Sequence, residues 1–92
     1  MYADSTADCI GACEAPMLLV KEKFGRLEKG QVLKVETDKP AVVRDVEDWA
    51  GNLGFSIEEQ EKVAGVTSIW IRKTKEWSEE IEPTMQTAEQ QR

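Results

Sequence analysis

Residues 8–27, DCIGACEAPMLLVKEKFGRL, place a cysteine shortly before an apolar pattern at helical spacing. Glu14 and Pro16 mark the start of a helix, because proline lacks only an N–H that has no partner in the first turn. Apolar residues then repeat at steps of three and four, which predicts one buried helix face. They are Met17, Val20, Phe24 and Leu27. The sequence EKG, with Gly30 as the stop, is expected to end this helix.

The segments around this helix alternate between apolar and polar residues, which predicts strands of a sheet. The strands are expected at residues 3–9, 31–37, 55–63 and 67–73. The last two should form a hairpin around a tight turn at AGV. In its second strand, Ile69 and Ile71 face inward and Trp70 faces the other side. Trp70 and Val32 therefore form either an exposed apolar face or one that the end of the chain covers through Trp77.

A second helix is predicted from TDKPA, where Thr37 or Asp38 caps the helix and Pro40 lies in its first turn. Its apolar face consists of Val42 or Val43, then Val46, Trp49, Ala50 and Leu53. The sequence GNLG should end it. The element order is β-α-β-α-β-β. We expect an α/β two-layer sandwich, with two helices on one face of a four-stranded mixed sheet.

The chain has 92 residues and a net charge of −6, so one domain is the default. Much of the negative charge lies in residues 76–92, which contain five glutamates and one arginine. We expect a globular domain at 1–75 and an acidic, flexible tail at 76–92. The net charge disfavours direct binding to nucleic acid. No signal peptide and no membrane segment is expected, which points to the cytoplasm.

The chain contains two cysteines, Cys9 and Cys13, and no histidine. A four-ligand zinc site and the histidine-dependent catalytic dyads and triads are therefore excluded within one chain. A cysteine ahead of a helix lies near free N–H groups and the positive end of the helix dipole, which lower a thiol pKa. Glu14 opposes this effect on Cys13 as a like charge. The other interpretation of Cys13 is a small buried apolar residue.

Several motifs follow one another in a characteristic order. Around the cysteine lie Asp8, Gly11, Cys13 and Pro16, and EKGQVLKVET follows as a turn and a strand. IWIRK forms an apolar last strand with a basic end. An Asp-x-Pro-Ala motif followed by Arg-Asp and an apolar residue consists of Asp38, Pro40, Ala41, Arg44, Asp45 and Val46. Together these motifs resemble the TusA-like (SirA/YedF) sulfur-carrier family across about residues 4–73.

The resemblance implies a two-layer α/β sandwich that carries sulfur as a covalent persulfide on Cys13, with no metal or other cofactor. A cysteine desulfurase or another donor would load the sulfur, and a downstream acceptor protein would receive it. The family places partner contacts at the end of the first helix near the cysteine, which makes Lys21 a candidate contact. Arg44 and Asp45 would form a structural ion pair or help to shape the site. The destinations of the family's sulfur include tRNA thiolation, molybdenum-cofactor enzymes and sulfur oxidation.

The sequence departs from the family pattern at two positions. Glu14 replaces the first proline of Cys-Pro-x-Pro, which leaves the loading rate or the partner choice open. Cys9 is an additional cysteine, which either packs in the core or resolves a Cys13 persulfide as a disulfide. Two alternatives to a sulfurtransferase therefore stay open. They are a non-catalytic interaction module of the same fold and a dithiol redox protein using Cys9 and Cys13.

Overall fold

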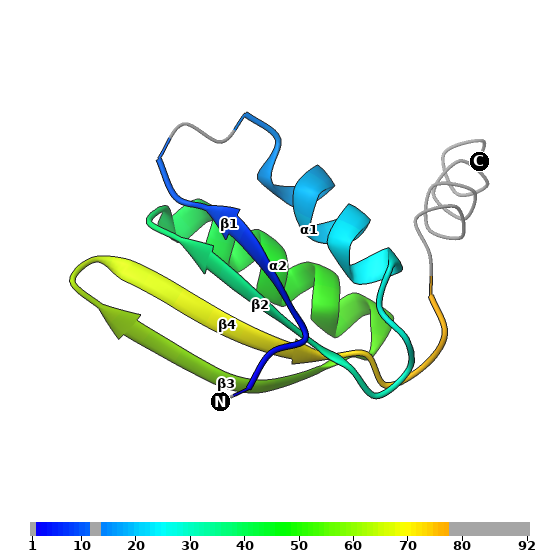
Figure 1. Ribbon diagram of the computed structural model, residues 1–92. Helices are drawn as coiled ribbons and strands as arrows, with labels where there is room; N and C mark the ends of the chain where they lie inside the picture. The colour runs from blue at the N-terminus through cyan, green and yellow to red at the C-terminus, as the bar shows by residue number, and fades with distance from the viewer. Residues whose placement is uncertain (1, 12–13, 78–92) are drawn as a thin grey trace, which may run out of the picture.

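In the computed structural model, strands and helices follow one another in the predicted order, and both helices cover the same face of the sheet (Figure 1). The structure describes residues 2–11 and 14–77. The elements are β1 (Ser5–Cys9), α1 (Pro16–Gly25), β2 (Val32–Thr37), α2 (Pro40–Leu53), β3 (Ser56–Val63) and β4 (Val66–Arg72). The two-layer α/β sandwich with a four-stranded mixed sheet is confirmed. In the described part of the chain, neither helix is long and apolar enough to cross a membrane.

The strands lie in the order β1-β2-β4-β3. β1 and β2 are parallel, and β4 is antiparallel to both of its neighbours. The carboxyl ends of β1, β2 and β3 therefore share one edge of the sheet, and the β3–β4 turn lies at the same edge. Because each helix follows directly on a strand, α1 and α2 also begin there (Figure 1). We call this edge, with the described residues 10–11, 14–15, 38–40 and 63–66, the carboxyl edge.

Four aromatic rings form the part of the core furthest from the carboxyl edge. The ring of Phe24, which is fully buried, lies 5.2 Å from that of Trp49, 4.7 Å from Phe55 and 5.8 Å from Trp77 between centroids. Trp77 is only 5% exposed. It therefore packs on the helix side of the sheet. The alternative in which Trp77 covers Trp70 is wrong. Residues 78–92, which make up most of the predicted tail, lie outside the described residues.

Trp70 lies on the face opposite the helices, as predicted, and the alternative in which it forms an exposed apolar face is wrong. Trp70 is 5% exposed and its neighbour Val32 is 4% exposed. The ammonium group of Lys34 lies 5.2 Å from the centre of the Trp70 ring. Lys34 also forms an ion pair with Glu36 at 3.1 Å. Around Trp70 and Val32 this face of the sheet therefore carries the Lys34–Glu36 ion pair rather than an exposed apolar patch.

The predicted end of the first helix is wrong, since α1 ends at Gly25 and not at Gly30. A buried lysine explains the earlier end. The Nζ atom of Lys73 donates to the carbonyl oxygens of Phe24 at 3.3 Å and of Leu27 at 2.5 Å. These carbonyls belong to the end of α1 and the turn after it, where a cation is favoured by the helix dipole. Gly30 instead donates its N–H to the Lys73 carbonyl at 2.7 Å and so prolongs the sheet.

α2 begins without the predicted side-chain cap. Lys39 is the cap residue, and no side chain accepts from the first turn of the helix. The Thr37 hydroxyl accepts from the Lys39 backbone N–H at 3.1 Å, while Asp38 is turned toward the β1–α1 connection. The end of α2 is as predicted, because Gly54 adopts a left-handed conformation with φ of 80°.

We expect Trp77→Ala to lower the free energy of unfolding by about 3 kcal/mol, since a buried aromatic side chain is removed from a packed cluster. Urea denaturation followed by circular dichroism measures this change. Tyr2→Ala is the matched control, because Tyr2 is 77% exposed, and its effect should stay within about 0.5 kcal/mol. An unchanged Trp77→Ala midpoint would show that the ring contributes nothing to the core.

A second prediction concerns Lys73 and pH. Burial lowers the pKa of Lys73 below its usual value of 10.5, and the nearby Glu76 carboxylate opposes part of this shift. The folded protein therefore loses this proton at a lower pH than the unfolded chain does. As pH rises from the folded pKa to 10.5, Lys73 increases the free energy of unfolding. Denaturation of the wild type and of Lys73→Met over this range should show a difference that grows in favour of the wild type. A difference independent of pH contradicts the prediction.

Candidate functional site

The predicted nucleophile, Cys13, belongs to the connection between β1 and α1, and it lies outside the described residues. Its sequence neighbours Gly11 and Glu14 are described, and both are exposed. The structure therefore shows how the connection is held at its two ends. These ends are Gly11, just after β1, and Pro16, the first residue of α1.

The first end is held by the junction between β2 and α2. Both carboxylate oxygens of Asp38 accept from the Gly11 backbone N–H at 3.3 Å. The Nζ atom of Lys39 donates to the Gly11 carbonyl oxygen and pairs with Asp38 Oδ1 at 3.1 Å. Gly11 has φ of 75°, a conformation that glycine adopts without a steric penalty. We call Gly11, Asp38 and Lys39 the Gly11 network.

The charge of Asp38 keeps the Gly11 network intact at neutral pH. The hydrogen bond from the Lys39 side chain, followed by that from the Gly11 backbone, lowers the pKa of Asp38 below its usual 3.8. The contribution of this carboxylate is therefore present above pH 3.8 and is lost as pH falls through the lower pKa of the folded state.

The second end of the connection is the start of α1. Pro16 occupies the first turn, and the cap residue Ala15 has no side chain that accepts a hydrogen bond. Within the described residues, no side chain caps this end of the helix. The free N–H groups and the positive end of the dipole are thus available to the connection that carries Cys13. Glu14 is exposed, so solvent weakens its field.

The other cysteine lies in the core. Cys9 is fully buried at the end of β1, and its Sγ atom lies 3.8 Å from the Pro16 carbonyl oxygen, to which it donates. It packs in the same core cluster as Val20 of α1. This burial supports the packing interpretation of Cys9.

The remaining predicted positions lie around the carboxyl edge and along α1. Pro40 is the first residue of α2, and Arg44 and Asp45 follow about one turn later, both exposed. The described residues contain no ion pair between Arg44 and Asp45. Lys21 is half-buried on the second turn of α1.

Three features of the site had no separate signal in the sequence. Lys39 was not singled out, because its contact with Gly11 bridges segments 28 residues apart. Ile10 and Leu18 are 43% and 60% exposed and flank the connection as apolar surface. The helical spacing in α1 identifies Leu18 as a residue outside the buried face, but it does not show that the connection lies beside it.

Comparison with known proteins gives consistent results. The family profile described as Sulfurtransferase TusA matches residues 6–73. The sulfur carrier protein TusA of Pseudomonas paraeruginosa is 34% identical over 71 residues, which cover 76% of this chain and 90% of that protein. YrkI of Bacillus subtilis, a candidate sulfur carrier, is 30% identical over 74 residues, with 79% and 99% covered.

Two further comparisons concern length and fold. A candidate sulfur carrier of Aquifex aeolicus is 36% identical over 83 residues, and the chain spans 41% of that protein's length. The crystal structure of the SirA-like protein from Desulfitobacterium hafniense superimposes with a TM-score of 0.66 at 27% identity. This match covers 77% of the present chain and 99% of the other. Since the family profile covers most of the chain, the protein belongs to the TusA family of sulfur carriers.

Proposed function

We propose that this protein accepts a sulfane sulfur on Cys13 as a persulfide and passes it to a partner protein. The proposal is supported by the match of the family profile to residues 6–73, a range that includes Cys13, and by the place of Cys13 in the sequence between β1 and the uncapped start of α1. The donor is a cysteine desulfurase or another protein persulfide, and the acceptor is a downstream protein of the relay. A reduced thiol is required, as the cytoplasm maintains.

The chemistry is thiol–persulfide exchange. The Cys13 thiolate attacks the terminal sulfur of a donor persulfide, so a new S–S bond forms on Cys13 while the donor's S–S bond breaks. The donor leaves as a thiolate, and the proton on the terminal sulfur moves with that sulfur to Cys13. The acceptor thiolate then repeats the same step on the Cys13 persulfide. Neither step needs an external oxidant or a metal.

The surroundings of the connection favour the thiolate form. The free N–H groups at the start of α1 stabilise a negative charge, while the exposed Glu14 opposes it only weakly. The Gly11 network holds the backbone two residues before Cys13 and limits the conformations that the thiol must search. The acceptor, and with it a destination such as tRNA thiolation, depends on the surface around the connection rather than on the sulfur chemistry.

We expect Cys13→Ser to abolish sulfur uptake. The reduced protein would be incubated with a cysteine desulfurase and cysteine, and in parallel with inorganic polysulfide, and its intact mass measured. The wild type should gain the mass of one sulfur atom. Cys9→Ala should gain it too, because Cys9 is buried. Uptake that persists in Cys13→Ser would overturn the proposal, and loss of uptake in Cys9→Ala alone would favour the dithiol alternative.

We expect Asp38→Asn to slow sulfur uptake from polysulfide by about threefold to tenfold, since charge-assisted contacts to Gly11 and Lys39 are replaced by weaker ones. The unfolding midpoint should change little because Asp38 is exposed. The control is Asp48→Asn, an exposed carboxylate on α2 outside the Gly11 network. Equal uptake rates in the two variants would show that the network does not position the connection.

A further inference from the structure

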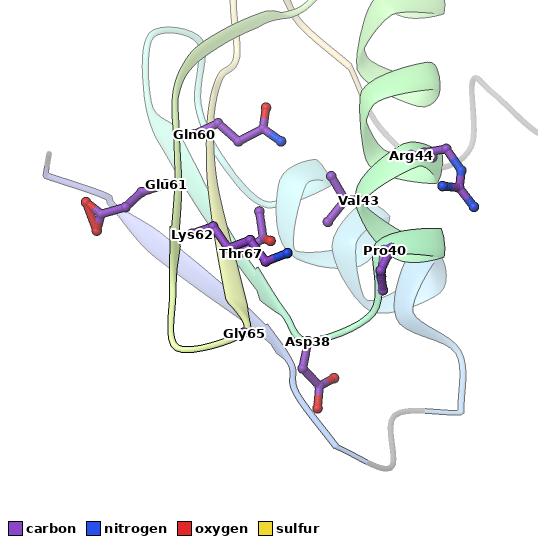
Figure 2. A pocket seen from close by; sticks show the side chains of 9 residues that line it. All are labelled: Asp38, Pro40, Val43, Arg44, Gln60, Glu61, Lys62, Gly65 and Thr67. Carbon is purple, nitrogen blue, oxygen red and sulfur yellow. The ribbon is translucent and has the colours of Figure 1, made fainter.

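A groove of about 540 Å³ lies at the carboxyl edge, between the first turns of α2 and the end of the β3–β4 hairpin (Figure 2). Pro40 and Val43 form an apolar wall on the α2 side. Gln60, Lys62 and Thr67 form a polar wall on the hairpin side. Asp38 of the Gly11 network lies at one end of the groove, so the groove adjoins the connection that carries Cys13.

The polar wall occupies positions that are apolar elsewhere in the sheet. In register, Ile57 pairs with Ile71, Gln60 with Ile69 and Lys62 with Thr67, all on the side that faces the helices. Ile57, Ile69 and Ile71 belong to the core or pack against it. Toward the hairpin end the same side of the sheet becomes polar, and Figure 2 shows Gln60 and Lys62 extending toward α2 while Glu61 points away.

Thr67 has hydrogen-bonding capacity that the fold leaves unused. Its side chain lines the groove and only 9% of the residue is exposed. Among the described residues no side-chain hydrogen bond of Thr67 is formed, and its hydroxyl is not one of the buried polar atoms without a partner, so it is open to the groove. A bound molecule with a donor or acceptor group would replace water at this hydroxyl.

The charges of the groove favour an anion. Lys62 and Arg44 have no carboxylate within 4.0 Å among the described residues, although the whole chain has a net charge of −6. Arg44 lies at the rim, with its guanidinium turned outward (Figure 2). The charge of Asp38 is balanced by Lys39. Glu61 also lines the groove but points away from it (Figure 2), so Lys62 is the charged side chain that extends into the groove without an ion pair among the described residues.

We propose that this groove binds an acidic peptide segment of the protein that exchanges sulfur with Cys13, an inference that rests on the proposed function. A carboxylate of the segment pairs with Lys62, and its backbone bonds with Gln60 and Thr67. Its aliphatic carbons pack on Pro40 and Val43. The volume exceeds what a single small anion fills, and an apolar wall facing amide and hydroxyl groups suits a peptide. The groove would thus direct the partner toward the Cys13 connection.

The test is an NMR titration of the ¹⁵N-labelled full chain with the blocked peptide acetyl-Glu-Val-Glu-amide. Amide shifts should centre on Gln60, Lys62 and Thr67, and the affinity should fall as salt is added. The matched peptide acetyl-Gln-Val-Gln-amide should bind at least about threefold more weakly. Lys62→Gln and Thr67→Val should each raise the Kd for the acidic peptide about threefold.

The control variant is Lys29→Gln, because Lys29 is an exposed lysine outside the groove. It should leave the Kd unchanged. The inference is overturned by shifts confined to other residues, by equal affinity for the two peptides, or by equal effects of Lys62→Gln and Lys29→Gln. Inorganic phosphate that binds the groove while the peptide does not would also overturn it.

Sulfur uptake from polysulfide separates this inference from the proposed function. Lys62→Gln should take up one sulfur atom on Cys13 as the wild type does, because polysulfide needs no docking segment. If the wild type takes up sulfur but does not bind the acidic peptide, only the docking inference fails. If the wild type takes up no sulfur, the proposed function fails whatever the peptide does.

Discussion

The parallel pairing of β1 with β2 is the constraint on which the site depends. It aligns Cys9 with Thr37, so the segments that leave the two strands start at the same edge of the sheet. Gly11 and Asp38 are 27 residues apart in sequence, yet they meet because of this register. A shift of one residue would turn the buried side of β1 toward solvent and separate the two segments. The core and the candidate site are therefore fixed by the same hydrogen-bond ladder.

The sequence predicts most of the fold because its signals are local. Apolar spacing identifies both helices and all four strands, and Pro16, Pro40 and Gly54 mark three of the four helix ends. The fourth end was misplaced because a distant residue determines it. Lys73 lies 46 residues from Leu27, whose carbonyl it binds. No window of sequence around residues 25–30 contains that information.

The candidate site was predictable in a similarly uneven way. A string of motifs predicts Cys13 as the sulfur-carrying residue, which stays a prediction because Cys13 lies outside the described residues. The burial of Cys9 at the end of a strand follows from the alternation of the sequence. The contacts of Asp38 and Lys39 could not be predicted from the sequence, since an Asp ahead of a Pro is equally typical of a helix cap. The groove between α2 and the hairpin was missed for a related reason. In the sequence, Gln60 and Lys62 look like residues of an ordinary solvent-exposed strand. Only the pairing register with β4 shows that they lie on the side of the sheet that faces the helices.

The position of Trp77 in the aromatic core has a consequence for biosynthesis. Trp77 follows its ring partners Phe24, Trp49 and Phe55 by 22 residues or more. β4, which is inserted between β2 and β3, also follows both of them in sequence. During synthesis both helices and the first three strands therefore leave the ribosome before the segments that close the sheet and the core. Stable folding, and with it protection of the apolar surface from aggregation or proteolysis, awaits synthesis through Trp77.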